Sequence, residues 1–383
     1  MDQHASAAPA PQAQRLPGLD LLRAWAIVWV MLTHADGFNL VSHQNWIVRF
    51  GWMGVDLFFV LSGFLIAGQL LRPFARGARP DYPRFFVRRL MRTLPAFLVV
   101  AGLYYLAPAV REYPTLPPAW QVFSFTGNLM AEPGRAFSHV WSLCVEEQFY
   151  LVFPALVALL ALKPSPRIVL AAGVAVVLLG MGLRGWFWLH DVAGTPFDLT
   201  AEPRGRAYMH LIYYPTWTRL DGLLAGVAAA AIRAFRPRLW ARITARPNLL
   251  LAAGLAGVIA TAAFFRDQIP GFWPCVLGFP LLSLSMALMV AGGGEARSLI
   301  GRRALPGAGA LAAGAYSLYL SHKAVFGWAA SHAPAGFALP IAVGGALVVG
   351  AALYWGVERP FLKLRDRLGG RSRTPLAAEP ATA

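Results

Sequence analysis

The sequence predicts an all-α fold, a polytopic integral membrane bundle of about ten transmembrane helices with both termini in the cytoplasm. Hydrophobic residues make up 57% of the 383 residues and charged residues only 14%, whereas soluble domains average about 45–50% and 25%. This composition excludes an ordinary soluble enzyme and a disordered chain. Two cysteines in a chain of this length also exclude a disulfide scaffold and a cysteine-built zinc site.

Ten apolar stretches are each long enough to cross a bilayer core of about 30 Å, which takes roughly 20 residues of helix. They are expected at 19–35, 51–71, 93–110, 141–162, 168–190, 211–232, 248–265, 272–291, 306–330 and 335–357. With the N-terminus inside, 24 of the 34 Lys and Arg residues fall on cytoplasmic segments and 7 on outer segments. This alternation follows the positive-inside rule and predicts a multi-pass protein of the inner (cytoplasmic) membrane.

The same alternation explains the net charge of +16 without nucleic acid as a partner. The basic segments are expected to meet anionic lipid headgroups of the membrane instead. Residues 18–368 are expected to form one transmembrane domain. The segments 1–17 and 369–383 are rich in Ala, Pro, Gly and Arg and are expected to be disordered cytoplasmic tails. The first span is interpreted as a retained helix, because Arg23 interrupts its apolar run and a poor cleavage site follows it.

Two ionisable residues, Arg23 and His34, lie in the first span. They are 11 residues apart, so they share one helix face about 16 Å apart along the axis. With the N-terminus inside, Arg23 lies near the cytoplasmic edge and His34 in the outer half. Ionisable groups in a bilayer core are costly and mark functional sites. The alternatives are an arginine that snorkels to the interface and a histidine that is a helix-end polar residue.

A basic amphipathic stretch joins the second and third spans on the expected cytoplasmic side. Its arginines Arg88, Arg89 and Arg92 are neighbours at helical spacing. The stretch alone favours anchoring to headgroups. The alternative is a clamp for a phosphorylated donor, because the guanidinium fork matches phosphate bidentately.

The fourth span places two adjacent carboxylates, Glu146 and Glu147, in the outer half of the membrane, with Ser142 one turn before Glu146. Ion pairing with another helix explains such residues. A role in polarising a histidine or in gripping substrate hydroxyls explains them equally well. Both interpretations stay open at this point.

Three further acidic or basic residues lie within spans. Asp56 is either a structural partner or a site residue. Arg219 and Asp221 are two residues apart and cannot face each other on a helix, so each needs a partner on another helix. Structural ion pairs are therefore the favoured interpretation of Arg219 and Asp221.

The last two spans carry the remaining polar candidates. Tyr319 and His322 share a face of the ninth span, which suits either sugar hydroxyls or an internal hydrogen-bond network. Glu358 closes the last span at the cytoplasmic edge, and Pro360 is expected to stop or redirect the helix. The sequence has no Walker loop, no GxGxxG after a strand, no HExxH and no GxSxG. It therefore predicts no metal and no tightly bound cofactor.

Six segments, taken in order, resemble the membrane acyltransferase-3 family from about residue 17 to 365. They are Arg23-x10-His34, Gly54–Leu65, Arg88–Arg92, Trp141–Tyr150 (WSLCVEEQFY), Tyr316–His322 (YSLYLSH) and Val357–Pro360. The resemblance implies a ten-helix enzyme that moves an acyl group, usually acetyl from acetyl-coenzyme A as donor substrate, onto a hydroxyl of a carbohydrate or related acceptor. It implies a catalytic role for the histidine at position 34 and donor-associated roles for the arginines at 23, 88, 89 and 92.

Some members of that family add an SGNH-type domain, and this chain resembles the members without one. The implied acceptor is a carbohydrate or lipid-linked glycan such as O-antigen or exopolysaccharide, with a macrolide or another small glycosylated metabolite as the alternative. His34 is expected to act as general base, or as the acyl carrier. Glu146 or Glu147 is expected to orient it, and His322 or Arg219 to stabilise the oxyanion.

Three other classes of protein fit less well. A secondary transporter would also bury charges, but no internal repeat is visible. A polyprenyl-linked glycosyltransferase would be expected to carry an acidic motif in the first large outer loop, where residues 35–50 offer only Asp36. A scaffold without activity leaves the two buried charges of the first span unexplained.

Overall fold

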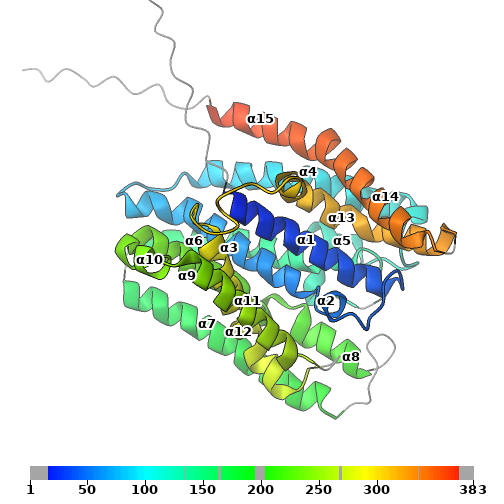
Figure 1. Cartoon of the computed structure of the whole chain (residues 1–383), viewed down its shortest axis with the longest axis horizontal. Coiled ribbons are helices and arrows are strands. Elements are labelled where there is room, and N and C mark those ends of the chain that lie inside the picture. Colours follow the sequence, from blue (N-terminus) through cyan, green and yellow to red (C-terminus); the bar gives the residue numbers. More distant parts are fainter. Residues whose placement is uncertain are drawn as a thin grey trace, which may run out of the picture.

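Every regular element is a helix within residues 16–132, 134–162, 165–194, 203–266, 270–334 and 336–370, which are the residues that the computed structural model describes (Figure 1). The all-α prediction is confirmed. The longer helices are α1 (Pro17–Gly37), α3 (Met53–Ala75), α4 (Tyr82–Leu106), α6 (Trp141–Leu162), α7 (Pro166–Phe187), α9 (Asp221–Phe235), α11 (Pro247–Phe264), α12 (Phe279–Gly293), α13 (Ala308–His332), α14 (Ala338–Leu353) and α15 (Arg359–Gly370). The shorter ones are α2 (Trp46–Arg49), α5 (Ala119–Phe123), α8 (Pro203–Tyr208) and α10 (Pro237–Ile243).

Six helical segments in the described part of the chain are long and apolar enough to cross a membrane. They are Met53–Ala75, Ser138–Leu162, Pro166–Val192, Pro247–Phe264, Pro274–Gly293 and Ala338–Leu368. The helices α1, α4 and α13 overlap three more of the predicted spans. They are not among the six apolar segments, and they carry the arginines, tyrosines and histidines of the polar interior. The number of ten spans and the side on which the termini lie stay predictions.

Figure 1 shows α1 beginning and α15 ending on the same side of the bundle (left). This arrangement is what a topology with both termini on one side of a membrane requires. The tails predicted at 1–17 and 369–383 lie outside the described residues for the most part. Within the described part, α1 already begins at Pro17 and α15 continues to Gly370.

The predicted span 211–232 is broken in the structure, which corrects the prediction of one continuous helix. A π-helical turn at Met209–Tyr213 and a 3-10 turn at Thr216–Thr218 precede α9, which begins only at Asp221. Pro215 lies in the break and has no N–H to continue a helix. Arg219 therefore lies in the connection before α9 rather than inside a helix.

Two buried ion pairs connect this break to the rest of the bundle. Nη2 of Arg219 lies 2.9 Å and 3.0 Å from the two carboxylate oxygens of Asp56 on α3. Nη1 and Nη2 of Arg184 on α7 donate to the carboxylate of Asp221, at 2.7 Å and 3.2 Å. The prediction that Arg219 and Asp221 each need a partner on another element is confirmed. Arg184 is fully buried.

The glycines of the second predicted span allow close helix packing. A Cβ at Gly63 would collide with the backbone carbonyl of Leu223 on α9, and one at Gly54 would lie 2.6 Å from the carbonyl oxygen of Ala26 on α1. Small residues permit such backbone approach between membrane helices. These glycines therefore let α3 pack closely against α1 and α9.

The last helix does not stop at Pro360. The segment Tyr354–Glu358 forms a π-helical turn that joins α14 to α15, and Figure 1 shows the axis bending between these two helices. Pro360 is the second residue of α15, directly after that turn. Of the two outcomes expected for Pro360, the structure has the redirected helix.

Candidate active site

A cavity of about 630 Å³ lies between α1, α3, α4, α6 and α13. It brings together eight of the residues that the sequence singled out: Arg23, Arg88, Arg89, Arg92, Ser142, Glu146, Glu147 and Tyr319. Sequence reasoning missed Arg84 and Arg365, which also line it. Arg365 comes from α15, and only the tertiary fold brings that helix against α4.

The arginines gather at one end of the cavity because of how α4 begins. The side chain of Asp81 caps α4 by accepting a hydrogen bond from the backbone N–H of Arg84. The residues from Arg84 to Arg92 therefore occupy the first turns of that helix. Arg23 comes from the early part of α1 and Arg365 from α15, so this end lies on the side of the bundle where the described chain starts and ends.

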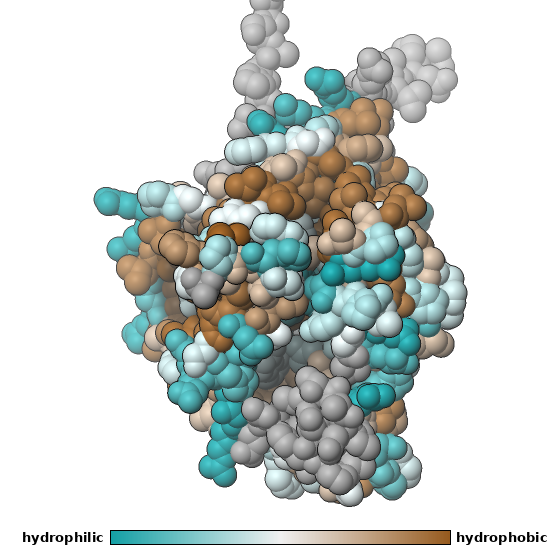
Figure 2. All heavy atoms as spheres, turned by 90° about the vertical axis from the view of Figure 1, so that its right-hand side faces the viewer, coloured by the Kyte–Doolittle hydropathy of each residue, from teal (hydrophilic) through white to brown (hydrophobic). Residues whose placement is uncertain are grey.

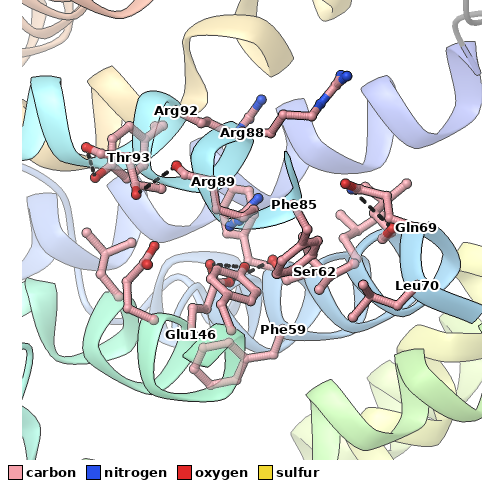
Figure 3. A pocket seen from close by; sticks show the side chains of 18 of the residues that line it. Phe59, Ser62, Gln69, Leu70, Phe85, Arg88, Arg89, Arg92, Thr93 and Glu146 are labelled. Atoms are coloured by element: carbon pink, nitrogen blue, oxygen red, sulfur yellow. Dashed lines mark hydrogen bonds between the residues drawn. The ribbon is translucent and has the colours of Figure 1, made fainter. Parts of the chain in front are cut away.

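The side chains of the arginines point in different directions. Figure 3 shows Arg89 pointing from α4 toward Ser62 and Glu146, while Arg88 extends away from them. The Arg89 guanidinium lies 3.9 Å from the centre of the Tyr150 ring, and its Nε is buried without a hydrogen-bond partner. Arg89 therefore keeps unused hydrogen-bonding capacity inside the cavity.

Glu146 accepts two hydrogen bonds, each 2.8 Å long, from Ser62 Oγ and Tyr150 OH. This geometry corrects the expectation that a glutamate orients His34. The side chain hydrogen bonded to His34 is His322, and no hydrogen bond between His34 and Glu146 or Glu147 is present in the described part of the structure. The two glutamates belong with the arginines in the cavity.

Ser142 and Tyr319 line the cavity at the end away from the arginines. Ser142 Oγ and Tyr319 OH are 2.7 Å apart, and Tyr319 OH also donates to the backbone carbonyl of His139. The single hydroxyl proton of Tyr319 is used in that second bond, so Ser142 is the donor between the two hydroxyls. Tyr319 also lies beside a cluster of histidines, with its ring centre 5.4 Å from that of His139.

The cluster contains His34, His139 and His322. Nδ1 of His34 lies 2.7 Å from Nε2 of His322, with the ring centres 4.9 Å apart. The ring of His139 lies 5.4 Å from the ring of His322 and 6.1 Å from that of His34. The predicted neighbours Tyr319 and His322 do share a face, with ring centres 5.9 Å apart.

Sequence reasoning missed His139, which lies in the 3-10 turn Ser138–Val140 just before α6. Its position three residues before Ser142 is the signal that could have identified it. A buried ion pair adjoins the cluster, with Lys323 Nζ 3.3 Å from Glu112 Oε1 and 3.1 Å from Ser138 Oγ. Glu112 was also missed, because the loop that carries it has no pattern linking it to α13.

The remaining candidates lie outside the cavity wall. Asp56, Arg219 and Asp221 are held in the ion pairs described above, so Arg219 is not free to stabilise an oxyanion. Glu358 accepts a hydrogen bond of 2.7 Å from Ser317 Oγ and is buried against α13. Among the described residues, no group of three or more His, Cys, Asp or Glu is arranged to hold a metal ion.

Comparison with known proteins places these features in a family. The model of a family described as an acyltransferase domain (acyltransferase 3) matches residues 16–356. The O-acetyltransferase OatA of Staphylococcus aureus (strain NCTC 8325 / PS 47) is 27% identical over 296 residues, which cover 72% of this chain and 44% of that protein. The peptidoglycan O-acetyltransferase OatA of Listeria monocytogenes is 29% identical over 270 residues, covering 65% and 38%.

The chain thus spans less than half the length of these two curated relatives. No solved structure matches the chain significantly.

Proposed function

This chain belongs to the acyltransferase-3 family, and we propose that it is a membrane O-acetyltransferase that moves an acetyl group from acetyl-coenzyme A to a carbohydrate hydroxyl. Both relatives are named as O-acetyltransferases, and the Listeria protein is named for peptidoglycan. These names support acetyl as the transferred group and a glycan as the acceptor. A macrolide or another small glycosylated metabolite is the alternative acceptor.

The observation that carries the proposal is the difference between the residues that line the two ends of the cavity. Arginines line one end, and the Ser142–Tyr319 pair lines the other and contacts the histidine cluster. Acetyl-coenzyme A has the same polarity, because its phosphates lie at one end and its thioester at the other. Arg89 and Arg92 suit the phosphates, since guanidinium groups bind phosphate oxygens bidentately. The thioester then extends toward Ser142 and Tyr319, and the Tyr319 ring lies 5.9 Å from that of His322 in the histidine cluster.

His34 is the general base in this proposal. It takes the proton of the acceptor hydroxyl while the hydroxyl oxygen forms a bond to the thioester carbonyl carbon. The carbon–sulfur bond then breaks, and the proton passes from His34 to the leaving thiolate. The atoms balance without another reactant, and coenzyme A and the O-acetylated acceptor are the products. Coenzyme A is a substrate here rather than a tightly bound cofactor.

The proposal also assigns a side to each substrate. The arginine-rich end faces the cytoplasm, as the distribution of Lys and Arg supports, and receives the donor there. Figure 2 looks onto the opposite end of the bundle, where polar residues (teal and white) are spread between hydrophobic ones (brown). His34 lies near that end of α1, so we place the entry of the glycan or lipid-linked glycan there. Exposed leucines and valines of α6, α7 and α14 suit contact with membrane lipid.

The test uses membranes that contain the full chain and acetyl-coenzyme A labelled in the acetyl group. Label should appear on extracted glycan, and His34→Gln should abolish its transfer while the protein still accumulates. The matched control is His332→Gln, because His332 is an exposed histidine on α13 away from the cavity. Transfer that survives His34→Gln contradicts the proposal, and so does substrate uptake without any acyl donor, which would identify a transporter.

The same experiment separates two mechanisms. When labelled donor is given without acceptor, label that stays bound to the protein and is lost in His34→Gln would identify His34 as the acyl carrier. A protein that stays unlabelled supports His34 as the general base.

A further inference from the structure

The hydrogen bonds around His322 fix which of its ring nitrogens carries the proton. Nδ1 of His322 lies 3.0 Å from the backbone carbonyl oxygen of Leu318, one turn earlier on α13. A carbonyl oxygen only accepts, so Nδ1 is the protonated nitrogen and donates to it. A neutral imidazole has one N–H. Nε2 of His322 therefore has a lone pair and acts as an acceptor.

This constraint passes to His34. Nε2 of His322 lies 2.7 Å from Nδ1 of His34, so Nδ1 of His34 must carry a proton and donate it. The other nitrogen of His34, Nε2, then has the free lone pair. No described residue forms a hydrogen bond to that atom.

The groups packed around the two rings leave this arrangement intact. Lys323 follows His322 on α13, but its ammonium is held by Glu112 and Ser138 from the loop side. The Nε2 of His139 lies 3.3 Å from the carbonyl oxygen of Leu320, so this nitrogen donates to a backbone group. None of these side chains forms a hydrogen bond with His34 within the described part of the chain.

The same bond between a histidine and the carbonyl four residues earlier occurs at His332, whose Nδ1 lies 2.9 Å from the carbonyl oxygen of Trp328. Such a bond therefore forms within a single helix and needs no tertiary contact. His322 differs because it is fully buried and its second nitrogen meets another histidine, from α1. It is the contact with His34, rather than the backbone bond, that links the two imidazole rings by a hydrogen bond.

We propose that His322 is a positioning residue that holds His34 in the tautomer with a free lone pair on Nε2, the atom that accepts the proton of the acceptor hydroxyl. This role rests on the proposed O-acetyl transfer. When Nε2 of His34 takes the proton, its Nδ1–H stays bonded to His322, which shares the positive charge through that hydrogen bond. A neutral ring backed by a main-chain carbonyl thus does what a carboxylate does in many histidine-dependent enzymes.

Two substitutions at position 322 separate positioning from packing. In His322→Gln, the amide oxygen can accept from His34 while the amide nitrogen donates to Leu318. His322→Phe fills the same space but offers His34 no acceptor. We expect His322→Phe to lower kcat about 100-fold, the range of general acid–base catalysis, with the KM for acetyl-coenzyme A unchanged. His322→Gln should recover at least a tenth of the wild-type kcat.

The control is His332→Phe, which removes the equivalent backbone bond at an exposed position and should leave kcat unchanged. Size-exclusion chromatography in detergent identifies variants that do not fold. A kcat near the wild-type value in folded His322→Phe overturns the proposal. A His322→Gln variant no more active than His322→Phe overturns it as well.

A spectroscopic measurement tests the tautomer without any acyl donor. In protein labelled with ¹⁵N at histidine, comparison with the His34→Gln variant assigns the signals of His34. The proposal expects an unprotonated Nε2 and a protonated Nδ1 in the wild-type protein, and loss of this preference in His322→Phe. A protonated Nε2 in the wild-type protein overturns the tautomer assignment even if acetyl transfer is observed. Correct nitrogen signals without acetyl transfer would refute the proposed function alone.

Discussion

The ion pair between Arg219 and Asp56 provides a quantitative test of which buried charges are structural. The pair does not line the cavity. The side chains of Arg219 and Asp56 are only 1% and 3% exposed. Four aromatic rings also surround the guanidinium, at 4.5–5.9 Å from its central carbon. Asp56→Asn keeps the shape of the side chain and removes its charge, so it isolates the electrostatic contribution.

Removing one partner of a buried ion pair leaves an uncompensated charge and costs about 3–5 kcal/mol. Solvent screening does not reduce this figure here, because both groups are buried. With an unfolding entropy of about 2.1 cal/mol/K per residue, a chain of 383 residues loses about 1.2 °C of Tm per kcal/mol. The expected decrease in Tm for Asp56→Asn is therefore about 4–6 °C.

The assay is thermal unfolding of purified protein in detergent for Asp56→Asn, Arg219→Met and the double variant. The double variant should be less destabilised than the sum of the single variants by roughly 0.5–3 kcal/mol, since it leaves neither charge unpaired. The control is Glu132→Gln, which removes a surface ion pair with Arg135 and should cost at most about 1 kcal/mol. The structural role would be refuted if the losses of stability in the two single variants were additive. It would also be refuted if kcat, measured per folded molecule, decreased in either single variant.

Three further outcomes are expected. Arg89→Lys should raise the KM for acetyl-coenzyme A about tenfold, because the guanidinium fork is lost, with little change in the KM for the acceptor. The control is Arg79→Lys, an exposed substitution outside the cavity, and an equal effect of Arg89→Lys on the KM of both substrates would indicate a folding role. In a background with both native cysteines replaced, Ser124→Cys should react with a membrane-impermeant thiol reagent on intact cells, whereas Ala78→Cys should react only after permeabilisation; the reverse pattern would overturn the proposed sidedness. Gly63→Val should reduce the yield of folded protein, because its Cβ collides with α9, and a normal yield would contradict the packing described for α3.

The histidine pair shows how much of the site the sequence predicted. Helical periodicity alone placed Arg23 and His34 on one face of α1, and Tyr319 and His322 on one face of α13. It also made Arg88, Arg89 and Arg92 neighbours on one helix. These relations hold within single helices, where the geometry of 3.6 residues per turn decides them. Periodicity did not predict which residue on another helix each of them contacts, and the expected contact between His34 and a glutamate was wrong.

The sequence by itself determined the all-helical class and the stretches that are apolar enough for a membrane. A bilayer requires each span to satisfy its own backbone hydrogen bonds, so these properties are local. Only the tertiary structure decided that His34 meets His322, 288 positions later, and that Asp56 meets Arg219, 163 positions later. It also decided that α15 brings an arginine to the cavity and that the helix predicted at 211–232 is interrupted before Asp221. Such contacts depend on how helices pack against one another, and the period of one helix contains no information on its neighbour.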